Sequence, residues 1–223
     1  MKRLTCLLGL IAGFSTATMA DVIFAADPSR LNANDSVDWG QFATDSVFPS
    51  PAAFTSVNGL IGTALTDDPG GFFRAMVPTS WASGFFPGDK ILNTNSLNYY
   101  PITITFDTPV FGAGAFVDDD LTITGFTASI SAYNGDTLLG VFPASGSGNG
   151  FGTVPFLGVL DDTAEITRVV FEITDTGAFT PLDMAIDTVV LNDAAVPVPE
   201  PGTSLLLSAS LLLASGFRNY SKR

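Results

Sequence analysis

Strict alternation of apolar and polar residues, in short runs divided by turn residues, most restricts how this chain can fold. Residues 126–133 (FTASISAY) place an apolar side chain at every second position. A period of two is typical of a strand with one buried face. The next residues, Asn134-Gly135-Asp136, favour a tight hairpin turn, because asparagine and glycine accept positive φ angles. The run TLLGVFPA then predicts the returning strand of a hairpin.

The same pattern recurs along the chain. PITITF puts Ile102, Ile104 and Phe106 on one face, and TRVVFEI does the same with Val169, Phe171 and Ile173. MAIDTVVLN predicts a last strand, and ASGSGNGFG (144–152) predicts a flexible loop. Further predicted strands are VIFAA, FTSVN, LIGTALT, FFRAMV, VFGAGAFV and GTVPFLGVL, with Gly, Pro, Asn or Asp between nearly all of them.

No part of the body has apolar residues at helical spacing over twelve residues. Around ten short strands without helices predict an all-β protein, a two-sheet, jelly-roll-like β-sandwich. The body is large enough for one domain with a full core. We assign this domain to residues 21–193.

The N-terminus has the features of a secretory signal peptide over residues 1–20. Lys2 and Arg3 precede an apolar run over residues 4–14, and Thr18-Met19-Ala20 supplies small residues for cleavage after Ala20. A membrane anchor is the weaker interpretation, because the apolar run is only about eleven residues long. Cys6 is the chain's one cysteine, so cleavage would leave neither disulfide nor thiol.

Charge excludes several partners. From Asp21 to Pro199 the chain has 21 acidic residues against four basic ones, a net charge of −17. Such a surface repels nucleic acid and anionic lipid, so we predict that the domain binds neither. It is compatible with a hydrated extracellular setting and with cation binding.

The C-terminus joins three different segments. We assign residues 194–198 to a linker. The proline-rich stretch VPVPEP (196–201), which begins within it, predicts a stiff, extended backbone. A helix over residues 202–217 would be about 24 Å long, somewhat short of the ~30 Å hydrocarbon core of a bilayer. Arg218, Lys222 and Arg223 follow it, and such cations hold the end of a membrane helix on the cytoplasmic side. A buried core helix is the alternative, but the run has no polar face.

This tail resembles the PEP-CTERM sorting signal of Gram-negative bacteria. Its three parts occur here in order: Pro199-Glu200-Pro201, an apolar segment over residues 205–217, and a basic end over residues 218–223. The basic end is looser than in many family members, since Asn219, Tyr220 and Ser221 interrupt it. The body is similar, in a general way, to the uncharacterised β-rich ectodomains of that group.

The resemblance implies a route of export. Signal peptidase would remove residues 1–20, and the tail over residues 199–223 would hold the chain in the inner membrane transiently. An exosortase recognising Pro199-Glu200-Pro201 would then cleave it and pass it to the cell surface or the extracellular matrix. The partners implied are signal peptidase, exosortase and an exopolysaccharide.

Residue types limit the chemistry of the domain. The chain has no histidine and the mature domain no cysteine, which excludes Ser-His and Cys-His nucleophiles and His- or Cys-ligated zinc. We therefore predict a structural or carbohydrate-associated protein that is not an enzyme. The alternative is a polysaccharide hydrolase that uses two carboxylates across the scissile bond.

Calcium is the cofactor that the acidic residues favour. Ca²⁺ takes six to eight oxygen ligands, and FVDDDLT offers Asp118, Asp119 and Asp120 at the end of a predicted strand. Asp187 in the last strand could add a ligand. Asp35 and Asp38 are further candidates. A solvated acidic turn explains the same residues without an ion, and no EF-hand spacing is present.

Aromatic residues beside Gly/Pro-rich stretches could form a surface on which sugar rings stack. The candidates are Trp81, Tyr99 and Tyr100, with Trp39 in a similar context. In a sandwich of this size most large aromatic residues fill the core, so a structural role is the alternative. We assign the nineteen phenylalanines overwhelmingly to the core.

Overall fold

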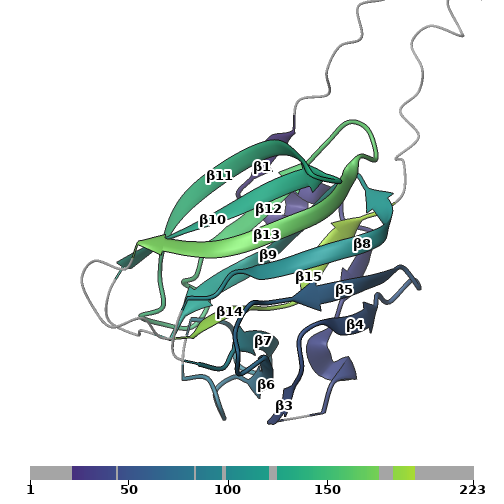
Figure 1. Cartoon of the computed structure of the whole chain (residues 1–223). Coiled ribbons are helices and arrows are strands. Elements are labelled where there is room, and N and C mark those ends of the chain that lie inside the picture. Colours follow the sequence, from purple (N-terminus) through teal and green to yellow (C-terminus); the bar gives the residue numbers. More distant parts are fainter. Residues whose placement is uncertain are drawn as a thin grey trace, which may run out of the picture.

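A computed structural model describes residues 22–43, 45–82, 84–96, 99–120, 125–175 and 183–193 of the chain. Within them, two antiparallel β-sheets pack face to face (Figure 1). The described helices are two short 3₁₀ turns, η1 (Pro28–Leu31) and η2 (Trp39–Gln41). The prediction of an all-β, two-sheet sandwich is confirmed. The predicted signal peptide, linker and sorting signal lie outside the described residues.

The smaller sheet has six strands. Their order is β11 (Thr137–Ser147), β10 (Gly125–Asn134), β13 (Ile166–Asp175), β8 (Ile102–Val110), β5 (Ile61–Leu65) and β4 (Ala52–Thr55). The predicted hairpin is confirmed, since Asn134 pairs with Thr137 across the turn and Gly135 has a φ of 56°. The predicted inward faces of β8 and β13 are also confirmed, because their alternate residues are at most 5% exposed.

The larger sheet has nine strands and forks. Its main order is β1 (Ile23–Ala25), β12 (Phe156–Leu160), β9 (Gly112–Asp119), β14 (Met184–Ile186), β7 (Lys90–Thr94), β6 (Phe72–Met76) and β3 (Ser46–Phe48). The other branch leaves β9 through β15 (Val189–Asn192) and ends with β2 (Asp35–Val37). The strands β2, β3 and β7 are absent from the sequence prediction.

The fork arises where the predicted last strand breaks into β14 and β15. At the break, Asp187 exchanges hydrogen bonds with Phe116 of β9: its amide donates to the Phe116 carbonyl (3.2 Å), and its carboxylate accepts from the Phe116 amide (2.9 Å). The Asp187 carboxylate thus takes the place of the backbone carbonyl that would accept from the Phe116 amide in a regular strand pair. The single strand predicted for MAIDTVVLN is therefore wrong in this detail.

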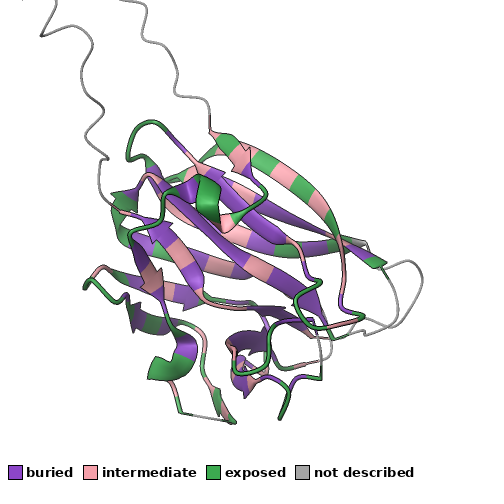
Figure 2. Ribbon diagram, turned by 180° about the vertical axis from the view of Figure 1, so that it is seen from behind, coloured by how far each residue is buried: buried purple, intermediate pink, exposed green. Residues whose placement is uncertain are grey.

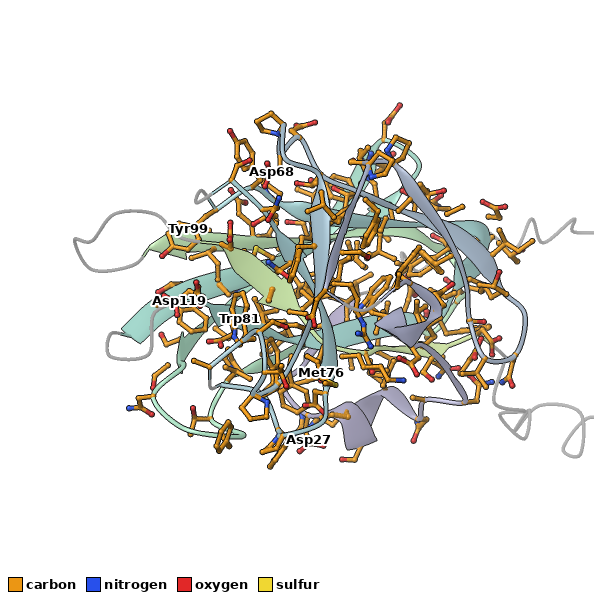
Figure 3. All side chains as sticks on the ribbon, turned by 90° about the horizontal axis from the view of Figure 1, so that it is seen from below. Asp27, Asp68, Met76, Trp81, Tyr99 and Asp119 are labelled. Carbon is orange, nitrogen blue, oxygen red and sulfur yellow. The ribbon has the colours of Figure 1, made fainter. Side chains whose placement is uncertain are left out.

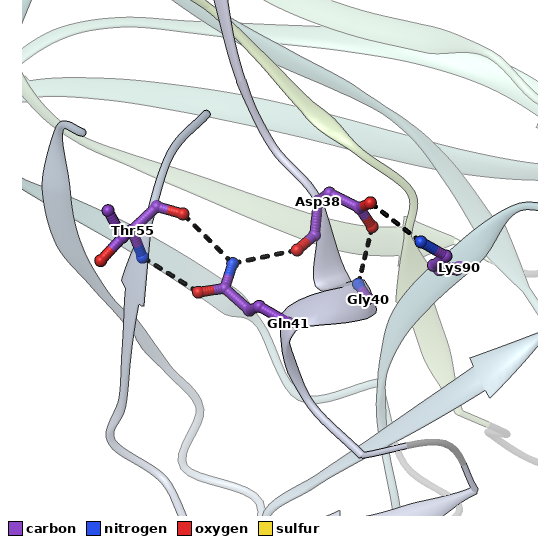
Figure 4. A network of polar contacts seen from close by, with 5 residues as sticks. All are labelled: Asp38, Gly40, Gln41, Thr55 and Lys90. Carbon is purple, nitrogen blue, oxygen red and sulfur yellow. Dashed lines mark hydrogen bonds and ion pairs between the residues drawn. The ribbon is translucent and has the colours of Figure 1, made fainter. Parts of the chain in front are cut away.

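Hydrogen bonds and an ion pair join turn η2, which follows β2, to β7 of the other branch and to β4 of the smaller sheet (Figure 4). Asp38 accepts from the Gly40 amide (2.7 Å) and forms an ion pair with Lys90 of β7 (2.9 Å). The indole nitrogen of Trp39 donates to the Asp187 carbonyl (2.6 Å), and Gln41 bonds both backbone groups of Thr55. The ring of Trp39 is fully buried, so it belongs to the core.

The main core lies between the sheets, and a smaller one lies outside the larger sheet. Figure 2 colours the buried residues of the ribbon purple. Outside the larger sheet, residues 77–82, 84–89 and 148–155 cover β6, β7, β14 and β9. The buried members of this smaller core are Ala75, Val77, Trp81, Phe85, Ile91, Val154 and Ala185. Residues on both faces of β9 are consequently buried, Phe116 only in part.

Both ends of the described chain leave from the same end of the sandwich. Ile23 pairs with Leu160, Leu160 with Gly112, and Gly112 with Asn192, so these four residues form one row across the larger sheet. Three strand spacings separate the outer two, or roughly 14 Å. The loop over residues 148–155 precedes Phe156, at the opposite end of β12.

Candidate functional site

Two exposed phenylalanines mark the most distinctive surface of the described residues. Phe86 is 58% exposed and Phe151 is 49% exposed, at the tips of two neighbouring loops. We call these side chains, with the loops over residues 84–89 and 148–153, the aromatic platform. An exposed aromatic ring leaves a large apolar area in water, so it indicates a binding surface when its neighbours are ordered.

Backbone hydrogen bonds join the two loops. The Gly84 amide donates to the Gly150 carbonyl (3.2 Å), and the Gly84 carbonyl accepts from the amides of Gly152 (2.7 Å) and Thr153 (3.2 Å). The Phe86 ring lies directly on Gly152, where an added Cβ would meet ring carbon Cζ at 2.4 Å. Glycine at this position, with a φ of 70°, therefore leaves room for the end of the Phe86 ring against the neighbouring loop.

Each loop is also closed upon itself. In the first, the Phe86 amide donates to the Asp89 carboxylate (2.8 Å), and Val77 and Asp89 bond through backbone groups (3.0 Å). In the second, the carbonyls of Ser147 (2.8 Å) and Gly150 (2.7 Å) both lie within hydrogen-bond distance of the Thr153 hydroxyl, which shares its one proton between them. Both loops thus hold their tips in place before any ligand arrives.

Trp81 and Asp118 form the foundation of the platform. Trp81, labelled in Figure 3, is 5% exposed and packs against Phe85. Its indole nitrogen donates to Oδ2 of Asp118 (2.9 Å). Gly84 covers that carboxylate, since an added Cβ would meet Oδ2 at 2.0 Å. The prediction that the Trp81 ring is exposed for stacking is therefore wrong. Its ring instead holds the first loop on the sheet.

Burial makes Asp118 an unusual acid. The residue is 1% exposed, and its other oxygen, Oδ1, has no hydrogen-bond partner. Desolvation raises the pKa of Asp118 to about 8, and the neighbouring Asp119 adds to this, while the Trp81 bond opposes it. The carboxyl group is consequently protonated and neutral at pH 7, beneath loops that themselves carry few charges.

The four predicted calcium ligands do not gather. Asp118 and Asp119 are both buried and, as neighbours on β9, point to opposite faces of the sheet. Asp120 is exposed just beyond the strand, and Asp187 lies at the fork. Within the part of the chain that the structure describes, no three acidic side chains are grouped to hold a metal ion.

Asp35, Asp38 and Asp187 interact with groups inside the protein. Asp35 accepts from the amides of Ser36 (2.7 Å) and Asn58 (2.9 Å) and from the Ser56 hydroxyl. Desolvation raises the pKa of Asp187 well above its usual range, with the Phe116 amide opposing and the nearby Asp89 adding to the shift. Burial pulls the pKa of Asp38 upward too, but the Gly40 amide and Lys90 outweigh it and leave that pKa lowered. These contacts give each carboxylate a structural role.

The two tyrosines of the predicted stacking surface lie elsewhere. Tyr99 and Tyr100 are both partly buried in the segment before β8, and Tyr99 packs against the main core. The platform instead uses Phe86 and Phe151, which the sequence prediction assigned to the core. The sequence around them does contain one indication that they lie in loops. Phenylalanine stands there among glycines, in GFFPGD and GNGFGT, without the apolar–polar alternation of a strand.

A separate cleft of about 410 Å³ lies between residues 47–50 and 66–71. Asp68 lies within it, but its carboxylate accepts from the amides of Gly70 (2.6 Å) and Asn95 (2.6 Å). These hydrogen bonds use the Asp68 carboxylate to stabilise the loops around it. None of the predicted site residues lines this cleft.

The predicted processing residues Ala20, Pro199, Glu200, Pro201, Arg218, Lys222 and Arg223 lie outside the described residues. In the described parts of the chain, no helix has the length and apolar character needed to cross a membrane.

Comparisons of this chain with known proteins give a weak likeness in fold. No family model matches it, and no curated protein matches it in sequence. Among solved structures, CsCBM6-3 from Clostridium stercorarium, in complex with cellobiose, has 15% identity and a TM-score of 0.33, over 59% of this chain and 86% of that one. TmCBM61, in complex with β-1,4-galactotriose, has 12% identity and a TM-score of 0.36, over 59% and 87%. A likeness of this degree says nothing of what this chain binds.

Proposed function

We propose that this chain is an exported, non-catalytic protein of the cell surface or extracellular matrix that binds neutral polysaccharide through the aromatic platform. The exposure of Phe86 and Phe151 on mutually bonded loops is the observation that carries the proposal. The face of an aromatic ring is electron-rich, and it suits the row of C–H groups on one side of a pyranose.

Charge selects among polysaccharides. No charged residue occurs from Pro78 to Gly88 or from Thr137 to Leu160. The platform is thus a neutral area on a domain of net charge −17, and an acidic polymer would be repelled by the rest of the surface. A neutral glycan meets no such barrier.

The orientation of the platform supports a surface role. The described chain ends at Asp193, and the row containing Asn192 lies at the end of the sandwich opposite the 148–155 loop. For a protein held by its C-terminal tail, the platform would face away from the membrane. Export, cleavage after Ala20, transient membrane retention and exosortase recognition of Pro199-Glu200-Pro201 belong to this proposal, as do the terminal helices and the jelly-roll arrangement.

The hydrolase alternative finds less support. A glycosidase needs a protonated acid that reaches the glycosidic oxygen. Asp118 has a raised pKa, but Trp81 and Gly84 cover its carboxyl group. Asp118 therefore has the protonation state of a general acid, but a substrate cannot reach its carboxyl group.

Retention on polysaccharide tests the platform. We expect Phe86→Ala combined with Phe151→Ala to weaken retention on an insoluble neutral glucan or galactan about tenfold or more, since buried aromatic anchors commonly contribute over 1 kcal/mol to binding. The matched control is Val57→Ala, because Val57 is 73% exposed on another loop. Equal retention of the double variant and the control would remove the platform from the proposal.

Processing tests the sorting signal separately. Replacing Pro199, Glu200 and Pro201 by alanine should leave uncleaved protein in the inner membrane of a host that encodes an exosortase. Cell fractionation followed by mass spectrometry of the C-terminus measures this outcome. Normal release of the triple variant would falsify the sorting step and leave the platform untouched.

A further inference from the structure

The outer side of the six-stranded sheet is a second surface that calls for a partner. We call it the open face; no described element packs on it, and in Figure 1 it lies in front of the other sheet. Four of the exposed large apolar residues belong to it: Ile61 at 54%, Leu65 at 41%, Leu138 at 50% and Val141 at 51%. They form two pairs, on β5 and on β11, with three strands between them. Exposed apolar area on a sheet face that no described element covers indicates an interaction surface.

Strand register aligns these residues in rows. Leu65 pairs with Thr103, Thr103 with Val170, Val170 with Ser131, and Ser131 with Val141. The row therefore crosses five strands and alternates apolar side chains with hydroxyl groups. It contains no charge.

The charges beside this row are arranged symmetrically about it. Arg168 and Glu172 lie on β13, two residues to either side of Val170, and all three point outward. They stand about 13 Å apart at ~3.3 Å per residue. Neither forms an ion pair or a hydrogen bond through its charged group with any described residue; the Arg168 guanidinium lies over the Tyr133 ring, 4.3 Å from its centre.

We propose that the open face binds the open face of a second copy of this chain, as a two-fold symmetric stack of sheets. A two-fold axis along the Val170 row exchanges the two directions along each strand. Arg168 of one copy then lies over Glu172 of the other, twice in the dimer, while Leu65 and Val141 each face their own counterpart. An isologous interface needs this kind of self-complementarity.

Charge favours a second copy over other partners. Two domains of net charge −17 repel each other through most of their surfaces, so a stable contact must use an area where opposite charges balance. On the five strands that the Val170 row crosses, the outward charged residues with described side chains are Arg168, Glu172 and Asp107 of β8, and the first two provide this balance. The open face is roughly 24 Å wide and 30 Å long, or about 700 Å², close to the ~800 Å² per partner of stable complexes.

Crosslinking tests the predicted axis. In the full chain with Cys6→Ser, Val170→Cys places one thiol on the axis, and a bis-maleimide that spans the ~10 Å between stacked sheets should join two copies. The control is Val57→Cys, which is more exposed but lies on a loop outside the open face. Dimer formation by the Val170 variant alone is the expected result, and equal crosslinking of the two variants would overturn the proposal.

Charge reversal tests the pairing. In the Val170→Cys background, Arg168→Glu should lower the crosslinked fraction about tenfold, because like charges then face each other across the interface. Adding Glu172→Arg restores opposite charges and should restore the dimer, which a merely misfolded variant would not do. Failure of this rescue, or retention of polysaccharide that depends on Leu65 and Val141, would overturn the dimer. The proposed function of the platform does not depend on the crosslinking or on the charge rescue.

Discussion

The outer faces of the two sheets meet different surroundings, although the strands beneath them follow similar rules. The larger sheet is covered by residues 77–82, 84–89 and 148–155, which bury Trp81, Phe85 and Asp118 against it. The smaller sheet keeps Leu65 and Val141 exposed to water. Coverage therefore depends on what the connecting loops do, and the alternation within a strand sets only which side chains face the core.

The covered face should be the more sensitive to substitution. We expect Trp81→Ala to lower the free energy of unfolding by roughly 3–5 kcal/mol, because it removes a large buried ring and the hydrogen bond to Asp118. Denaturant titration measures the change, and polysaccharide retention should fall with it. On the open face, Val141→Ala should change stability by no more than about 0.5 kcal/mol. Similar losses at both positions would erase the contrast between the faces.

The covered face should also make the stability of the protein depend on pH, through the buried Asp118. Since burial raises the pKa of Asp118 to about 8, the folded protein holds this proton more tightly than the unfolded chain, whose carboxyl has a pKa near 3.8. Between those values unfolding releases the proton, so this contribution to stability is complete below pH ~4 and lost as the pH rises to ~8. The slope is about 1.4 kcal/mol per pH unit, or roughly 3 kcal/mol between pH 5 and pH 7.

Asp118→Asn should remove this part of the pH dependence, because an amide keeps an acceptor for Trp81 and does not titrate. Unfolding titrations at pH 5, 6 and 7 would show it as a flatter dependence than that of the unmodified protein. Asp136→Asn, at the exposed hairpin turn, is the matched control and should keep the original slope. Parallel curves for all three proteins would mean that Asp118 is already ionised in the folded state.

The sequence was most informative where local pattern and burial agree. Alternation correctly predicted the inward residues of β8 and β13, because a strand with one wet face must place apolar side chains at every second position. The two-residue turn at Gly135-Asp136 was equally local. The strands β2 and β3 were missed, since three residues cannot show a period and their pairing partners lie far along the chain.

Long-range contacts decided what the sequence could not predict at the candidate site. Trp81 lies in a Gly/Pro-rich stretch that suggests exposure, but its partner Asp118 lies 37 residues away on another strand. Phe86 follows the buried Phe85 directly, and the backbone of this loop is held by hydrogen bonds from Gly84 to the second loop and from Phe86 to Asp89. The three consecutive aspartates suggested a shared ion, but the pleat of β9 separates Asp118 from Asp119.

The smallest expected change in the free energy of unfolding concerns Leu138 on the open face. It tests whether the apolar residues of this face serve the binding of a second copy. Leu138→Thr replaces a half-exposed side chain by one with good strand propensity, so at high dilution the free energy of unfolding should change by no more than about 0.5 kcal/mol. If two copies stack through this face, the same change should matter only at high protein concentration, where binding adds to apparent stability. Melting curves at concentrations a hundredfold apart measure the difference between these regimes. A concentration-independent loss would place Leu138 in the stability of the single chain, and the open face would then need no second copy to explain it.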